Sequence, residues 1–212
     1  MEPGVRLYYI PSVSSIPSVS SIPSEHYYEL LNDIDIHEGQ PFDYVKHSVL
    51  QHPAFCRDAI GLSPPFLIWA LKSSQISIYL EDETGAVCGA CGVNVKTDCL
   101  YIEGICVAVE KKRYGTLLIN KISEIAVRLE KPKIILEAHK EANIDFYRKN
   151  GFSVLPDQER RQTLRSMSRN LFEEGLGRKK KRKRSGKRNL SRNNKRRIKQ
   201  YKILLVRRIK HQ

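Results

Sequence analysis

The sequence predicts an α/β (α+β) domain with a mixed, largely antiparallel sheet flanked by helices, followed by a disordered basic tail. Three observations predict this arrangement. Strand-like alternation occupies the middle of the chain, helical spacing lies on both sides of it, and a block of positive charge is confined to the C-terminal end. We therefore divide the chain into a strand with a Pro/Ser-rich linker (1–24), a folded domain (25–174) and a basic tail (175–212).

The composition excludes several classes of protein. With 212 residues, 41% hydrophobic and 28% charged, the chain resembles a globular domain with an added charged segment, not a collagen or a disulfide scaffold. We expect no transmembrane segment, and the start lacks the basic region and apolar run of a signal peptide. Five cysteines leave at least one unpaired, which favours a reducing compartment.

The N-terminal third contains a strand, a linker and short helices. Val5, Leu7 and Tyr9 alternate as in a first strand. Residues 10–24 repeat Ile-Pro-Ser-Val-Ser-Ser, and because proline recurs at every sixth position, we expect an extended linker. From residue 25 to 73, apolar clusters interrupted by prolines predict two or three short helices.

The middle of the chain predicts a meander followed by alternating helices and strands. Residues 75–80, 86–95 and 100–109 predict three antiparallel strands. Apolar residues spaced three and four apart predict a helix that closes before Pro132. The expected elements after it are a buried strand (133–138), a helix (141–149), a strand from Phe152, and a strand or short helix within 164–171.

The connection from Val107 to Leu118 is a candidate anion site. A strand runs into Lys112, Arg113, Tyr114, Gly115 and Thr116 and opens directly into a helix. The free N–H groups and the dipole of a helix N-terminus attract anions, and glycine permits close backbone approach. A phosphate or pyrophosphate is the expected ligand, although the pattern is neither a P-loop nor a three-glycine dinucleotide motif, and a solvated basic turn is the alternative.

These elements together resemble the GNAT superfamily of acyl-CoA N-acyltransferases. The resemblance covers roughly residues 75–171, and its most specific part is Phe146-Tyr147-Arg148-Lys149-Asn150-Gly151-Phe152. It implies transfer of an acetyl group from acetyl-CoA to a primary amine of an unidentified acceptor, with a protein as one class of acceptor. Acetyl-CoA is thus implied as co-substrate.

The resemblance also implies roles for individual residues. The backbone near Cys106 and Val107 would pair with the pantetheine arm, and Arg113 to Thr116 would form the pyrophosphate loop. Tyr147 would protonate the leaving thiolate, and Glu103 would act as the base for the amine. A packed tyrosine and an ordinary exposed strand glutamate are the structural alternatives for these two residues.

The sequence departs from the family pattern in the loop. The family reads Gln/Arg-x-x-Gly-x-Gly/Ala, and aligning Gly115 with the last position puts Glu110 at the first position and Arg113 at the middle glycine. Lys140 replaces an asparagine that the family often carries. These departures raise the alternative of a catalytically inactive GNAT-fold protein that acts as a nucleic-acid-binding or interaction module through its tail.

Two other groups of residues have a functional and a structural interpretation. Cys88, Cys91, Cys99 and Cys106 match a zinc site in number, but a spacing of three within an alternating strand would point Cys88 and Cys91 to opposite faces, so we expect no metal site and buried thiols. His139 follows a buried strand and is more typical of a polar surface residue than of a base.

The basic block indicates a partner. Residues 178–210 hold 18 of the 37 Lys and Arg residues, and no acidic residue follows Glu174. Residues 178–184 form a run of the nuclear-localisation type, while 198–209 interleave apolar and basic residues, as in a helix that forms on an anionic partner. We expect binding to nucleic acid or a nuclear import receptor and a nuclear or nucleocytoplasmic location, with a membrane-surface helix or a solubility tag as alternatives.

Overall fold

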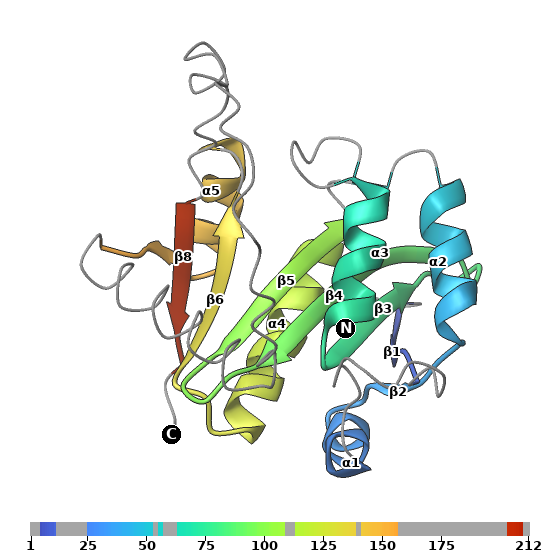
Figure 1. Cartoon of the computed structure of the whole chain (residues 1–212), viewed down its shortest axis with the longest axis horizontal. Helices are drawn as coiled ribbons and strands as arrows, with labels where there is room; N and C mark the ends of the chain where they lie inside the picture. Colours follow the sequence, from blue (N-terminus) through green and yellow to red (C-terminus); the bar gives the residue numbers. More distant parts are fainter. Residues whose placement is uncertain are drawn as a thin grey trace, which may run out of the picture.

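A computed structural model describes residues 5–11, 25–52, 55–56, 63–108, 113–138, 141–156 and 203–209. One sheet runs through this part of the chain, with helices on both of its faces (Figure 1). The strands are β1 (Arg6–Tyr9), β2 (His37–Glu38), β3 (Ile76–Glu81), β4 (Val87–Val95), β5 (Leu100–Val107), β6 (Lys133–Ala138), β7 (Ser153–Val154) and β8 (Ile203–Arg208). The helices are α1 (Glu25–Asp33), α2 (Phe42–Gln51), α3 (Pro64–Ser73), α4 (Tyr114–Arg128) and α5 (Glu141–Lys149).

The sheet is mixed and mostly antiparallel. Its strand order is β2-β1-β3-β4-β5-β6-β8-β7. The pairs β1–β2 and β5–β6 are parallel and every other pair is antiparallel. The predicted fold class, the three-stranded meander and the helices that surround it are therefore confirmed.

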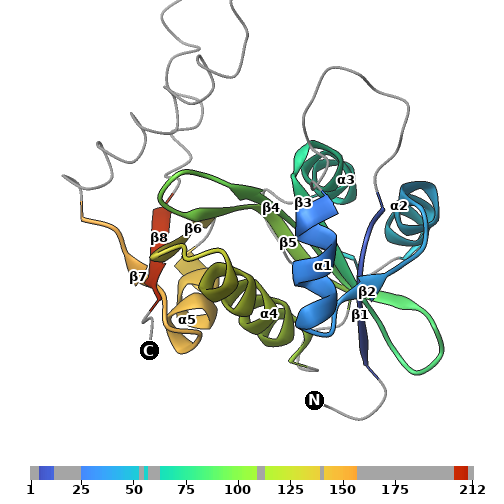
Figure 2. The same ribbon diagram turned by 90° about the horizontal axis from the view of Figure 1, so that it is seen from below.

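Two hydrophobic clusters hold the helices to the sheet. The larger lies beneath α1, α4 and α5, where α4 contributes Leu118, Ile122 and Ile125, spaced three and four apart on its buried face. The second lies beneath α2 and α3 on the opposite face. Figure 2 shows α2 and α3 on one side of the sheet and α4 and α5 on the other.

Local sequence signals explain where helices α3 and α4 begin. The side chain of Ser63 caps α3 by accepting the backbone N–H of Phe66 at 3.4 Å, and Pro64 begins the helix, where its missing N–H costs no hydrogen bond. Helix α4 begins after Arg113, whose backbone is left-handed with φ 54° and ψ 9°. Non-glycine residues rarely adopt this conformation, so Arg113 stands where the backbone favours glycine.

The prediction of a continuous disordered tail over residues 175–212 is wrong for its last part. Residues Ile203–Arg208 form β8, which lies between β6 and β7 in the sheet. Leu205 is fully buried, and all six residues of β8 pair with β6. These residues therefore form a strand instead of a helix on an anionic partner, because their run of Ile, Leu and Val pairs with a buried strand.

Some predictions lie outside the described residues. One group lies before the site and within it, namely the Pro/Ser repeat after residue 11 and residues 109–112, which include Lys112. The others are His139, Lys140, the strand or helix within 164–171, and the basic run 178–184. In the described part of the chain, no helix is both long and apolar enough to cross a membrane.

Candidate functional site

Strands β5 and β6 diverge halfway along their length. They pair in parallel from Leu100 opposite Ile134 to Ile102 opposite Leu136, and the pairing ends there although both strands continue. Figure 1 shows their ribbons separating toward their C-terminal ends. Beyond Ile102, the backbone N–H and C=O groups on this edge of β5 form no ladder with β6. They can therefore form hydrogen bonds to another partner.

A β-bulge places Glu103 at the point of divergence. Gly92 pairs with Gly104 and Val93 pairs with Ile102, so Glu103 is the extra residue on β5. A bulge bends its strand and changes the direction of the side chains that follow. Ile102 accordingly packs under α4, whereas Cys106 packs in the cluster beneath α2 and α3.

Glu103 is held by hydrogen bonds from the neighbouring strand. The amide Nδ2 of Asn94 donates to Glu103 Oε1 at 2.8 Å, and Asn94 Oδ1 accepts the backbone N–H of Gln75 at 3.1 Å. Asn94 is a buried polar residue, so its two bonds fix the amide and thereby orient the carboxylate of Glu103. This chain of contacts gives a base a defined position.

A second carboxylate lies on the same face of the sheet. The pKa of Tyr101 is raised, first by burial and then by the carboxylates of Glu137 and Glu103, and Glu137 accepts a hydrogen bond from the phenol. Tyr101 also packs against Ile135, which shares this face. Two carboxylates, those of Glu103 and Glu137, therefore lie near Tyr101 on this side of β5 and β6.

Tyr147 approaches from the other face. Its side chain is 7% exposed and packs under the sheet against Phe146 and Phe152, with ring centroids 5.2 and 5.8 Å away. Burial raises the pKa of Tyr147, and the nearby Cys91 on β4 adds to the shift. Because α5 lies against β6 while Cys91 belongs to β4, two strands away, the Tyr147 side chain extends beneath the divergent part of β5.

The Tyr147 hydroxyl has no hydrogen bond to a side chain or backbone group within the described ranges. A buried hydroxyl without a partner costs about 1–3 kcal/mol, so it is well suited to a ligand atom that completes its bonding. Its raised pKa keeps the phenol protonated at neutral pH, as a proton donor to a thiolate must be.

The predicted anion loop is described from Arg113 onward. Arg113 is exposed, Tyr114 is 4% exposed, and Gly115 and Thr116 follow in the first turn of α4, which carries no acidic residue. A Cβ added at Gly115 would lie 2.9 Å from Cζ of Phe146, so this glycine also permits the close approach of α5. The N–H groups of a first helical turn have no intrahelical acceptor, and the turn therefore retains its capacity to bind an anion.

Residues 43–152, just over half of the chain, match the family model described as the acetyltransferase (GNAT) family. The chain belongs to the GNAT family.

Comparison with solved structures gives matches of low identity, and the two described here have TM-scores below 0.5. The chain matches N-acetylglutamate synthase from Neisseria gonorrhoeae, complexed with coenzyme A and N-acetyl-glutamate, at 15% identity and a TM-score of 0.48, over 100% of this chain and 36% of the synthase chain. It matches Tetrahymena GCN5 at 13% identity and a TM-score of 0.47, over 79% of this chain and 88% of that one. This chain therefore spans about a third of the length of the gonococcal synthase. No curated protein sequence matches.

The GNAT fold here brings together only some of the predicted site residues. Glu103 and Tyr147 lie on opposite faces at the divergence of β5 and β6, and Val107 ends β5 beside it. Arg113 and Gly115 stand at the start of α4. The expectation of a buried thiol is wrong for Cys106, because its side chain forms a disulfide with Cys56, with 5.5 Å between the Cα atoms; the role of its backbone stays a prediction.

The prediction that Cys88 and Cys91 point to opposite faces is wrong. Both side chains are buried in the cluster beneath α4, because a bulge between β3 and β4 makes Cys88 an extra residue and reverses the alternation. Cys88, Cys91 and Cys99 are buried and form no disulfide in the described part of the chain. Within the described residues, no cluster of three or more His, Cys, Asp or Glu side chains could hold a metal ion.

Sequence reasoning missed Asn94, Tyr101 and Glu137. Asn94 has a visible signal, since it is a polar residue in the otherwise apolar or small run of β4. Tyr101 and Glu137 carry no such signal, because their contact depends on the pairing of β5 with β6.

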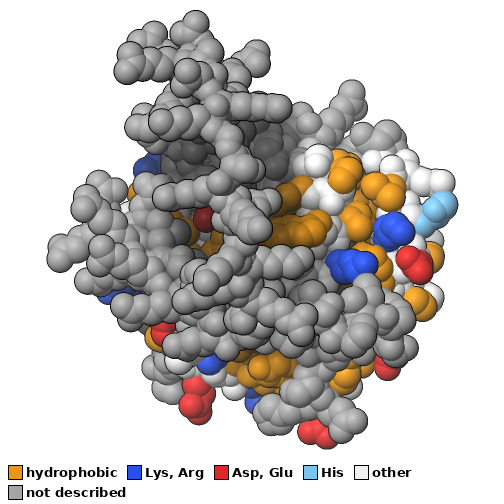
Figure 3. Space-filling view, in the orientation of Figure 1, with side chains coloured by type: hydrophobic (Ala, Val, Ile, Leu, Met, Phe, Trp, Pro, Cys, Tyr) orange, Lys and Arg blue, Asp and Glu red, His pale blue; other side chains and the backbone are white. Residues whose placement is uncertain are grey.

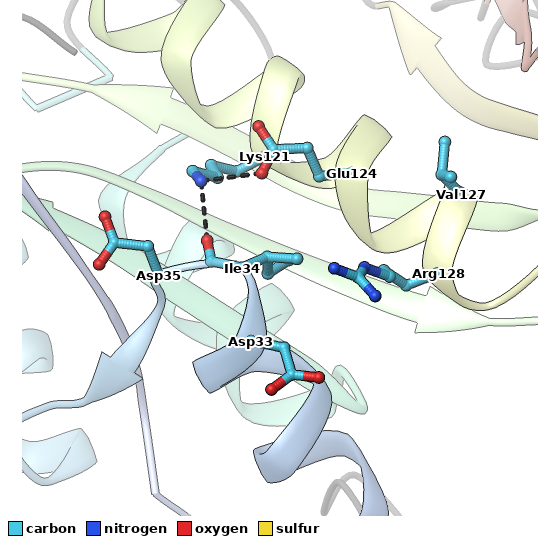
Figure 4. Close-up of a pocket in the computed structure, with 7 residues that line it drawn as sticks. All are labelled: Asp33, Ile34, Asp35, Lys121, Glu124, Val127 and Arg128. Carbon is cyan, nitrogen blue, oxygen red and sulfur yellow. Dashed lines mark hydrogen bonds and ion pairs between the residues drawn. The ribbon is translucent and has the colours of Figure 1, made fainter.

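A separate pocket of about 460 Å³ lies between α1 and the second half of α4 (Figure 4). Its lysine is already engaged, since Lys121 Nζ donates to the Ile34 carbonyl at 2.7 Å and to Glu124 at 2.8 Å. The lining residues are Asp33, Ile34, Asp35, Lys121, Glu124, Val127 and Arg128. None of them belongs to β5, β6 or α5, so this pocket is distinct from the divergence of β5 and β6.

Hydrophobic side chains reach the surface on the α2 and α3 face (Figure 3). Trp69 of α3 is 54% exposed and packs against Phe66, with ring centroids 5.4 Å apart. Helix α3 crosses β4 and β5 on the face that carries Glu103. The exposed Trp69 and the half-buried Phe66 therefore lie on the same face of the sheet as Glu103.

Proposed function

We propose that this GNAT protein transfers the acetyl group of acetyl-CoA to a primary amine. The observation that carries the proposal is the divergence of β5 and β6, with an oriented carboxylate at Glu103 on one face and the buried hydroxyl of Tyr147 on the other. An acyl donor lying between the strands would have a base on the side of the amine and a proton donor on the side of the leaving thiolate.

The described residues fit acetyl-CoA. Near Cys106 and Val107, β5 does not pair with β6, so its backbone N–H and C=O groups on that edge can bond to the amides of the pantetheine arm. The first turn of α4, with Arg113 before it and Gly115 within it, suits a pyrophosphate, and Lys112 precedes it in the sequence. The coenzyme A bound in the gonococcal synthase is consistent with this assignment.

In this mechanism Glu103 accepts a proton from the ammonium of the acceptor, and the neutral amine attacks the thioester carbonyl carbon. The C–N bond forms, the C–S bond breaks, and the Tyr147 hydroxyl gives its proton to the departing sulfur. The tyrosine is reprotonated by the second proton that the nitrogen loses. Binding both reactants in a fixed geometry supplies most of the acceleration.

Release of free CoA from acetyl-CoA, measured with a panel of amine acceptors, tests this proposal. Glu103→Gln and Tyr147→Phe should each lower kcat by about 10²- to 10⁴-fold. Tyr44→Phe is the matched control, because the exposed Tyr44 hydroxyl bonds the Gly85 carbonyl at 3.2 Å, away from β5. Equal rates for all three variants and the unmodified chain would rule out these catalytic roles.

Arg113 favours a second candidate function, because an arginine in a left-handed conformation occupies the family's glycine position. In this alternative, the fold has lost its cofactor and the basic segment 178–202 binds nucleic acid or a nuclear import receptor. A nuclear or nucleocytoplasmic location accompanies either function and is tested by imaging the chain with and without substitutions in 178–184. Failure to bind acetyl-CoA would favour this alternative over catalysis.

A further inference from the structure

The pocket between α1 and α4 has walls that are fixed by hydrogen bonds and by the core. After α1, the backbone N–H of Ile36 donates to the Leu31 carbonyl at 2.9 Å, and Asp35 has a left-handed backbone with φ 61°. This turn is tied to α4, because Lys121 Nζ donates to the Ile34 carbonyl at 2.7 Å. Since Ile34 and Ile36 are buried in the larger hydrophobic cluster, the core holds the turn against α4.

Some of the charged groups around the pocket already have partners. Lys121 Nζ lies 2.8 Å from Glu124 Oε2, and Asp35 Oδ1 lies 3.1 Å from His37 Nε2. The charged groups without such a contact are Asp33 and Arg128, which are both exposed. In the part of the chain that the structure describes, neither forms an ion pair, either with the other or with a third group.

These two opposite charges stand on different walls of the pocket. Asp33 is the last residue of α1, and Arg128 is the last residue of α4. Figure 4 shows the Arg128 guanidinium extending from α4 toward the end of α1, where Asp33 lies. The pocket volume of about 460 Å³ is within the range of small-molecule sites, about 300–1,000 Å³. A small ligand can therefore lie between the two charges.

The two charges indicate the chemical class of the ligand. A guanidinium binds a carboxylate through two parallel N–H donors, and a carboxylate accepts hydrogen bonds from an ammonium. A free α-amino acid carries both groups, so it can bond to Arg128 and to Asp33 at the same time. An anion or an organic cation alone would leave one of the two without a partner. A metal ion does not fit, because the described residues form no cluster of His, Cys, Asp or Glu that could hold one.

The pocket also has an apolar surface. Ile34 and Val127 line it, and Val127 is 45% exposed although it is hydrophobic. Covering an exposed hydrophobic side chain removes apolar area from water, which is favourable. An amino acid with an apolar side chain therefore gains a contact here that glycine cannot make.

We propose that this pocket binds a free α-amino acid with an apolar side chain, whose carboxylate contacts Arg128 and whose ammonium contacts Asp33. The lining residues belong to α1, the turn after it and α4, and none belongs to β5, β6 or α5. The inference therefore goes beyond the proposed acetyl transfer and does not depend on it.

Titration of L-leucine into the full chain, followed by calorimetry and by the Tm, tests the proposal. We expect saturable binding with a dissociation constant of about 0.1–1 mM and a Tm that rises with leucine concentration. Isocaproate is leucine without its amino group, and isoamylamine is leucine without its carboxylate. Each should bind at least about tenfold more weakly, because one charged side chain then has no partner. Glycine keeps both charges and should also bind more weakly than leucine.

Substitutions in the pocket locate the binding. Arg128→Gln and Asp33→Asn should each weaken leucine binding by about tenfold or more. Both side chains are exposed, so neither substitution should change the Tm of the ligand-free protein appreciably. Asp43→Asn is the matched control, because Asp43 is an exposed aspartate on α2, which lies on the other side of the sheet from α4 (Figure 2). It should leave leucine binding unchanged.

Three outcomes overturn the proposal. The first is that leucine shows no saturable binding. The second is that isocaproate or isoamylamine binds as tightly as leucine, which would show that only one of the two charges is used. The third is that leucine binds Arg128→Gln and Asp33→Asn as tightly as the unmodified chain, which would place it elsewhere. Release of CoA from acetyl-CoA is measured separately, so failure of the acetyltransferase function would leave these binding results unaffected.

Discussion

Substitutions at Arg113 test the loop before α4 by two independent measurements, the stability of the fold and the affinity for acetyl-CoA. Its backbone has φ 54° and ψ 9°, and its side chain is exposed. In the folded state, a residue with a Cβ in the left-handed conformation is about 1–2 kcal/mol less stable than glycine. Glycine has more conformational freedom in the unfolded chain, which lowers its stability advantage by about 0.5–1 kcal/mol. Arg113→Gly should therefore be more stable than Arg113→Ala by about 1 kcal/mol.

Thermal unfolding and calorimetry measure the two effects. For a chain of 212 residues, 1 kcal/mol corresponds to a difference in Tm of about 2–4 °C between the variants. Both variants lose the same positive charge, so any difference in their affinity for acetyl-CoA reports how closely the backbone approaches the pyrophosphate. We expect the glycine variant to bind more tightly. An alanine variant as stable as the glycine variant would refute the left-handed conformation, and equal affinities would place the pyrophosphate elsewhere.

Three further variants test other parts of the structure. Tyr147→Phe should keep or slightly raise the Tm, because it removes a buried hydroxyl that has no partner among the described residues. The same variant should lower kcat about 10²- to 10⁴-fold with little change in KM. A lowered Tm together with the lowered kcat would indicate a packing role instead. Gly92→Ala should cost about 2–3 kcal/mol of unfolding free energy in urea denaturation, because its Cβ would lie 2.8 Å from the backbone oxygen of Ala70; a neutral result would show that α3 can move away from β4. Burial raises the pKa of Tyr79 to about 12, so the folded state holds the phenol proton longer than the unfolded state and stability should fall between about pH 10 and pH 12. Tyr79→Phe should reduce this dependence in unfolding measured against pH without abolishing it, because the pKa values of Tyr101 and Tyr147 are raised as well.

The sequence predicts the local elements of this fold because their signals are local. Alternation in β3, β4 and β5 and the three-and-four spacing in α4 are each complete within one segment. The family pattern places a glycine at the position of Arg113, but the left-handed backbone found there was not predicted.

The remainder depends on contacts between distant segments. β8 could not be predicted, because a four-residue apolar run in a basic context becomes part of a strand only by pairing with β6, which is distant in sequence. The bulges at Cys88 and Glu103 shift the alternation by one residue, and their positions follow from pairing between strands. The contact of Tyr101 with Glu137 joins two strands for the same reason.

The position of β8 also determines how cofactor binding should be measured. A truncation after residue 174 would remove a buried strand from the interior of the sheet, so the full chain is required. Attraction of a polyphosphate to the basic segment is instead suppressed by glutamine at Lys179, Lys180, Lys181 and Lys183. These substitutions lie outside the described residues and leave β8 unchanged.

Calorimetric titration of acetyl-CoA into this glutamine variant tests the central claim most directly. We expect saturable micromolar binding with one molecule per chain, little changed from the unmodified protein and only moderately reduced by salt, because the proposed site lies on β5, α4 and α5. Binding that is absent, or that disappears with the four lysines and with salt, would contradict it, since the charge of the segment would then be the only basis for cofactor binding.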